Sequence, residues 1–120
     1  LQRMSEVENQ IYDTFNADQD LAATGGIDGI EFADRIESNV LPAWVKLRED
    51  VESFLTLKYA DQDYLERLVR YLRTREESWR LLVEGLQEQD KRKIQGAREM
   101  HEDAQKDLQD GLKSRTGDKQ

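Results

Sequence analysis

The sequence predicts an all-α protein, an antiparallel up-down-up-down four-helix bundle. Three observations lead to this prediction. Apolar residues recur at steps of three and four over four stretches, short connections rich in glycine or capping residues separate these stretches, and the chain contains a single proline. Each stretch can therefore bury one stripe of side chains against a common centre. A three-helix core with a loosely attached first helix is the alternative.

The first predicted helix ends near Ala23. Its apolar stripe begins with Val7, Ile11 and Phe15, and Ser5 has a glutamate three residues later, which is the spacing of a capping box. This stripe is the weakest of the four. We therefore expect the first helix to be the segment that is most readily displaced from the core.

The second predicted helix starts at Ile30, after a turn. Three glycines within Thr24–Gly29 indicate that turn, because glycine tolerates positive φ. The apolar stripe then keeps its phase through Phe54. Pro42 lies inside this helix, where it removes one hydrogen bond and clashes with the carbonyl of Ser38, so we expect a kink rather than a break.

The third predicted helix, Asp63–Leu86, has the largest capacity for burial. Its N-cap is predicted at Asp61 or Asp63, and Asp63 has a glutamate three residues on. One position of the stripe, Arg75, is charged, whereas the other positions are apolar. Those apolar positions are Leu65, Leu68, Leu72, Trp79, Leu82 and Leu86.

The fourth predicted helix follows a tight turn near Gly85 and begins after Asp90, which is a good N-cap. Its stripe is narrow and includes His101. One bundle domain is predicted over residues 1–113, because a chain of this size buries about one core. Residues 114–120 offer nothing to bury, so they are predicted to fray.

Composition excludes several classes of function. The 120 residues carry a net charge of −8, and residues 1–60 hold 12 acids and 5 bases, hence −7. Such a surface disfavours nucleic acid and anionic lipid. No apolar run is long enough to span a bilayer, which predicts a soluble protein without direct membrane insertion. The absence of cysteine leaves the compartment open, whether cytoplasmic or periplasmic, and the oligomeric state is open as well.

No catalytic, metal or cofactor motif is present, so the prediction is a protein that is not an enzyme and binds no cofactor. The only histidine, His101, follows Arg98 where a di-metal bundle needs a glutamate, and it precedes Gln105 where a zinc helix needs a second histidine. The acidic stretch Asn16–Asp20 lacks the glycine and glutamate of a calcium loop. We therefore expect that stretch to be a solvated helix end.

Two polar residues, Arg75 and His101, occupy positions where the stripes require apolar side chains. Antiparallel register places Arg75 opposite Trp44, and His101 opposite Trp79, in one layer at the middle of the bundle. Two interpretations follow. The layer is either a pocket for an anionic or aromatic ligand, or a structural layer that fixes the register, with Arg75 stacked on Trp44. The sequence favours the structural interpretation, because polar positions of this kind often serve register.

The segments Val40–Trp44 (VLPAW) and Tyr71–Trp79 (YLRTREESW), followed by Leu82 and Asp90, resemble a helical region of bacterial rhomboid-type membrane proteins. The resemblance covers about residues 33–110. It implies a soluble appendage of a membrane protein. It transfers no catalytic residue, because the chain has no serine motif of that family.

The function predicted from the sequence is that of a non-enzymatic interaction or accessory module with a protein partner. Because the chain starts at Leu1 without a methionine, we expect it to come from a longer protein. The second hypothesis is a sensor bundle that binds a small anionic or aromatic ligand at the layer of Trp44, Arg75, Trp79 and His101. A metal-dependent enzyme is the third.

Overall fold

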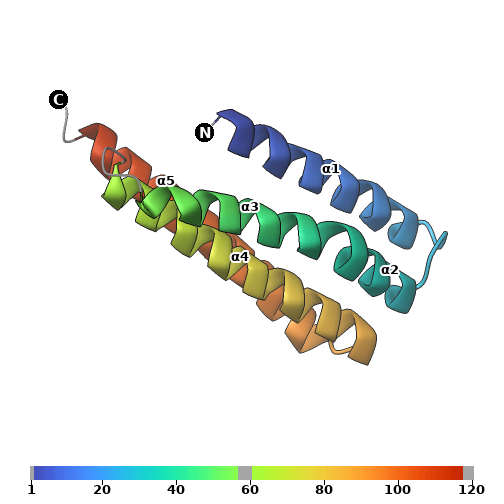
Figure 1. Ribbon diagram of the computed structural model, residues 1–120. Coiled ribbons are helices and arrows are strands. Elements are labelled where there is room, and N and C mark those ends of the chain that lie inside the picture. The colour runs from blue at the N-terminus through green and yellow to red at the C-terminus, as the bar shows by residue number, and fades with distance from the viewer. Residues whose placement is uncertain (1, 57–60, 118–120) are drawn as a thin grey trace.

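The computed structural model describes residues 2–56 and 61–117, with side chains for residues 4–55 and 61–111. The predicted all-α bundle is confirmed (Figure 1). The helices are α1 (Gln2–Ala23), α2 (Gly29–Arg35), α3 (Leu41–Ser53), α4 (Gln62–Glu88) and α5 (Lys91–Gly117). A π-helical turn, η1 (Ile36–Val40), joins α2 to α3, and a short 3-10 turn, η2 (Phe54–Thr56), follows α3.

Figure 1 shows α1, the α2–η1–α3 segment, α4 and α5 each running opposite to the segment before it. Ion pairs record this register: Arg48 of α3 meets Glu76 of α4, and Lys93 of α5 meets Glu84 of α4. Helix α1 packs on the α2–η1–α3 segment, whereas α5 packs on α4 (Figure 1). In the described part of the chain the backbones of α1 and α5 do not approach closely. One side of the bundle is therefore bridged by side chains alone.

Helix α1 is joined to the core. Ile11 is 4% exposed, and Met4, Val7 and Phe15 pack against the core as half-buried side chains. The predicted N-cap at Ser5 is wrong, because the helix already starts at Gln2. Residues 2–4 are good helix formers, so nothing in the sequence forces the helix to begin later.

The stretch Asn16–Asp20 was expected to be a solvated helix end, and for Asp18 this expectation is wrong. Asp18 is 7% exposed, and its Oδ1 accepts a hydrogen bond of 3.0 Å from Nη1 of Arg35 on α2. This ion pair ties the end of α1 to the segment that follows the turn. The turn itself is confirmed: Gly25 has a φ of 81°, and Asp28 caps α2 by accepting from the N–H of Glu31 at 2.7 Å.

The second helical stretch continues through Pro42. This continuity was predicted, because the apolar stripe keeps its phase across the proline. The turn before it is π-helical, and the N–H of Leu41 bonds to the carbonyl of Ile36, five residues earlier. Pro42 falls in the first turn of α3, where the lack of an N–H is tolerated. The wider turn therefore absorbs the proline that the sequence places there.

Helix α4 begins at Gln62, after the first of the two predicted N-caps. Its N-cap is Asp61, whose Oδ1 accepts from the N–H of Tyr64 at 3.1 Å, and Asp63 lies within the first turn, where an acidic side chain favours the helix dipole. The cap at Asp90 is confirmed, since it accepts from the N–H of Arg92 at 2.9 Å. Gln89, at a φ of 55°, ends α4 in the left-handed conformation.

The hairpin between α4 and α5 depends on Gly85. A Cβ at this position would lie 2.9 Å from Cγ1 of Ile94, so glycine permits the close approach of the two helices. Helix α5 continues to Gly117, four residues beyond the predicted domain boundary at Lys113. Fraying of residues 114–120 stays a prediction. Among the helices of the described chain, none is long and apolar enough to cross a membrane.

We predict that Pro42→Ala is tolerated or mildly stabilising, because it restores a donor and raises helix propensity. Chemical denaturation would give the free energy of unfolding. Leu41→Ala, a neighbouring buried change, is the sensitivity control and should cost about 2–5 kcal/mol. A loss above about 2 kcal/mol for Pro42→Ala would mean that the π-helical turn itself is required to place Trp44.

Candidate functional site

The site is organised around Arg75 of α4. This side chain is only 2% exposed, and its guanidinium carbon lies among three aromatic rings. The distances from Cζ to the ring centroids are 4.6 Å for Trp79, 5.4 Å for Trp44 and 5.6 Å for Tyr12. Cations attract ring faces at such distances, and more strongly when water is excluded. We call Arg75 with Tyr12, Trp44 and Trp79 the aromatic box.

Two hydroxyl groups accept hydrogen bonds from Arg75. Its Nη2 and Nε donate to Tyr12 Oη at 2.9 and 3.3 Å, and its Nη1 donates to Ser78 Oγ at 2.6 Å. These bonds engage three of the five N–H groups that a guanidinium carries. No carboxylate of the described residues forms an ion pair with Arg75. The buried charge is thus held by neutral groups.

Trp44, Arg75 and Trp79 of the predicted layer lie together, whereas the ring of His101 meets Tyr12 and not Trp79, which the register placed opposite it. Trp44 is fully buried, donates its indole N–H to the carbonyl of Leu72 at 2.8 Å, and meets Trp79 with ring centroids 5.9 Å apart. His101 of α5 reaches the layer through Tyr12, whose ring centroid is 6.0 Å away. The expected stacking of Arg75 on Trp44 is present, with Trp79 closer still.

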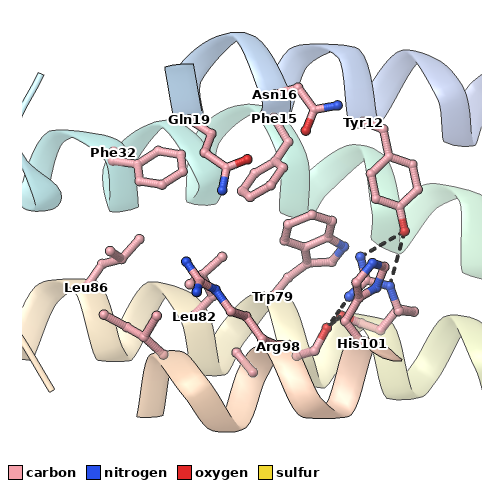
Figure 2. Close-up of a pocket in the computed structure, with 14 residues that line it drawn as sticks. Tyr12, Phe15, Asn16, Gln19, Phe32, Trp79, Leu82, Leu86, Arg98 and His101 are labelled. Atoms are coloured by element: carbon pink, nitrogen blue, oxygen red, sulfur yellow. Dashed lines mark hydrogen bonds between the residues drawn. The ribbon is translucent and has the colours of Figure 1, made fainter. Parts of the chain in front are cut away.

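A cavity of about 340 Å³ adjoins this layer, on the side where α1 faces α5 (Figure 2). Fourteen residues of the described chain line it, and none of them is acidic. They are Tyr12, Phe15, Asn16, Gln19, Phe32, Arg75, Ser78, Trp79, Leu82, Leu86, Ile94, Ala97, Arg98 and His101. In a protein with a net charge of −8, this lining has a positive bias from its two arginines. Trp44 lies behind the lining and supports it.

Two buried polar atoms next to the cavity have no hydrogen-bond partner among the described residues: Nε1 of Trp79 and Nδ1 of His101. Figure 2 shows the indole nitrogen of Trp79 turned toward the end of the cavity where Tyr12 and His101 lie. Leaving a buried polar atom unpaired costs about 1–3 kcal/mol. The two atoms therefore lack the partner that such buried groups normally have.

The same environment keeps His101 neutral. Burial, followed by the nearby charge of Arg75, lowers the pKa of His101 to about 4. At neutral pH the imidazole is thus a hydrogen-bonding group without charge. The proton of the neutral imidazole can reside on either ring nitrogen, depending on the hydrogen-bonding group that His101 meets.

Glu8 is the acid that approaches the layer from α1. Its Oε2 accepts a hydrogen bond of 2.9 Å from the hydroxyl of Tyr71. Burial raises the pKa of Glu8, while this hydrogen bond and the charge of Arg75 pull it down. Glu8 lies outside the cavity lining, so it offsets the charge of Arg75 only from a distance.

Sequence reasoning missed Tyr12 and Ser78. Tyr12 is one residue beyond the apolar position Ile11, and the spacing of Tyr12, Phe15 and Gln19 could have indicated a second inward-facing stripe on α1. Ser78 is three residues after Arg75 on the same helix, which is hydrogen-bonding distance for side chains. Asp107 of α5 forms an ion pair with Arg70 and not with Arg75.

A search of the described residues for three or more clustered metal-ligand side chains finds none. Comparisons of the chain with protein-family models, with curated proteins and with solved structures find no match. The site is therefore interpreted from its own geometry.

We predict that His101 makes the protein less stable as the pH falls from 6.5 toward 4. In this window the unfolded chain binds a proton at His101 and the folded chain does not, so the free energy of unfolding decreases by at most about 1 kcal/mol per pH unit, given its partial exposure. Melting temperatures at pH 7 and pH 5 would measure this. His101→Gln should show a smaller drop, and an equal drop would refute the assignment.

Proposed function

We propose that the protein is a non-enzymatic module that binds a small organic anion in the cavity between α1 and the α4–α5 hairpin. The observation that carries this proposal is Arg75, a buried guanidinium without a carboxylate partner among the described residues, beside a cavity with no acidic lining. This proposal corresponds to the second hypothesis from the sequence, the sensor bundle. The layer around Arg75 would then bind a ligand and also fix the register of the helices.

The energetics of Arg75 favour an anion. A buried charge costs several kcal/mol unless it is paired. The aromatic box and two hydroxyls offset part of that cost, but two N–H groups of the guanidinium remain without a partner in the described residues. A carboxylate oxygen accepting from them would form charge-assisted hydrogen bonds, which are about twice as strong as neutral ones.

The unpaired atoms of Trp79 and His101 support the same ligand. The indole N–H can only donate, and a neutral imidazole with its proton on Nδ1 donates as well. An acceptor placed at this end of the cavity would satisfy both donors together with Arg75. An amine would find no acidic partner in the lining.

The state of the polar groups supports a proposal of binding rather than catalysis. Ser78 Oγ donates to the carbonyl of Arg75 at 2.7 Å and accepts from its guanidinium, so its hydroxyl is fully engaged. His101, with its pKa lowered to about 4, is a weak general base at neutral pH. Neither residue is prepared to act as a nucleophile or its activating base.

The wider role in this proposal is that of an accessory module, as expected from the sequence. The resemblance of two segments to a helical region of rhomboid-type proteins supports the proposal that this module is an appendage of a larger or membrane-associated protein. Ligand occupancy between α1 and α5 would then change the surface offered to a protein partner, because α1 reaches α4 and α5 only through side chains.

We predict that small carboxylates raise the melting temperature of the protein, whereas the matched amides and amines do not. A ligand at ten times its Kd contributes about 1.4 kcal/mol. Arg75→Leu should keep or raise the stability of the free protein and abolish this response, because apolar packing replaces a buried charge. Arg75→Ala should lose about 1–3 kcal/mol through missing packing.

Arg70→Leu is the matched control, since Arg70 is an exposed arginine of the same helix. It should leave the response to carboxylates unchanged. Binding that survives Arg75→Leu, or a wild-type protein that responds to no carboxylate, would refute the proposed function and restore the purely structural interpretation of the layer.

A further inference from the structure

We infer that the ligand is an amphipathic monocarboxylate, with its carboxylate at the Arg75 end of the cavity and a flexible apolar tail directed toward Phe32 and Leu86. This inference rests on the proposed function and narrows its ligand to one chemical class.

The cavity is polar at one end. The guanidinium of Arg75, the hydroxyl of Tyr12 and the unpaired atoms of Trp79 and His101 gather there. Figure 2 shows Tyr12 and His101 at this end and Phe32 and Leu86 at the opposite end, with Phe15 and Trp79 between them. A ligand with one charged group is therefore oriented by the cavity itself.

The other end of the cavity is apolar. Phe15 and Phe32 stack with ring centroids 5.6 Å apart and an angle of 26° between the rings, which gives a rigid wall. Leu82, Leu86 and Ile94 complete this end. No buried polar group lies among these residues, so a second charge on the ligand would lose its water without compensation.

The remaining polar residues of the lining are Asn16, Gln19 and Arg98, and all three are exposed. They belong to the edge of the cavity that faces solvent rather than to its floor. Figure 2 shows the side chain of Arg98 extending beside Leu82 toward the Leu86 end, and its positive charge favours the approach of an anion. Because Arg98 is exposed, water already solvates its charge, and an ion pair between Arg98 and a second ligand carboxylate would add little affinity.

The volume sets the length of the tail. A cavity of about 340 Å³ accommodates on the order of ten groups of the size of a water molecule or a methylene. Octanoate has ten non-hydrogen atoms, so a carboxylate with about eight carbons fills the space. Shorter acids leave the apolar end empty, and longer ones extend into solvent between α1 and α5.

The test is isothermal titration of the whole chain with butanoate, octanoate, dodecanoate, octanol, octylamine and octanedioate. Each buried methylene contributes about fourfold in affinity. Octanoate should bind at least tenfold more tightly than butanoate, and dodecanoate should gain less than tenfold over octanoate. Octanol, octylamine and octanedioate should each bind at least tenfold more weakly than octanoate.

Leu86→Ala enlarges the apolar end and should move the preference toward dodecanoate. Leu108→Ala is the matched control, because Leu108 is also a half-buried leucine of the core but lies outside the cavity lining. Melting curves would verify that both variants fold. If Leu86→Ala and Leu108→Ala keep the same chain-length preference, the tail does not lie where we place it.

The outcomes separate the two levels of the proposal. Equal affinity for butanoate and octanoate, with binding still lost in Arg75→Leu, would overturn the amphipathic ligand and leave the proposed function intact. Equal affinity for octanoate and octylamine would overturn the carboxylate head. If no carboxylate binds, both proposals fail together.

Discussion

The burial of Arg75 is the constraint on which the middle of the bundle depends. A guanidinium that is 2% exposed cannot rely on water, so every neighbouring segment must contribute something to it. Helix α3 contributes the face of Trp44, α4 contributes Trp79 and Ser78, and α1 contributes Tyr12. These contributions explain why the weakest helix by apolar pattern is nevertheless tied to the core.

The same constraint produces the cavity. Helices α1 and α5 are held apart by the large side chains of the layer, and their backbones do not close the gap within the described residues. The ring of Phe15 lies 4.7 Å from that of Trp79, which braces α1 over the opening. Side chains of four helices thus enclose a space whose polar end is Arg75 and whose apolar end is the wall of Phe15 and Phe32. A bundle with leucine at position 75 would have no reason to retain the polar end.

The sequence was sufficient to predict the helices and the meeting of Trp44, Arg75 and Trp79, because three- and four-residue spacing and antiparallel register are properties of the helix itself. His101 was predicted opposite Trp79, but its ring meets Tyr12. The sequence could not predict the cavity, because an empty volume depends on how all the surrounding side chains pack together. Tyr12 was missed for a related reason: a tyrosine beside an apolar stripe faces inward or outward depending on the neighbouring helix. The π-helical turn before Pro42 was predicted only as a kink, because several local distortions relieve the same clash.

The burial of the Arg75 guanidinium is tested most directly by the NMR signal of its Nε–Hε group. This signal is assigned by its loss in the Arg75→Leu variant. The proton lies near the faces of Trp79 and Trp44 and donates to Tyr12. The account predicts a separate signal, shifted upfield by the rings, with slow exchange against water and a further shift when octanoate is added. A signal that overlaps those of the exposed arginines and exchanges as quickly would contradict the buried guanidinium and everything inferred from it.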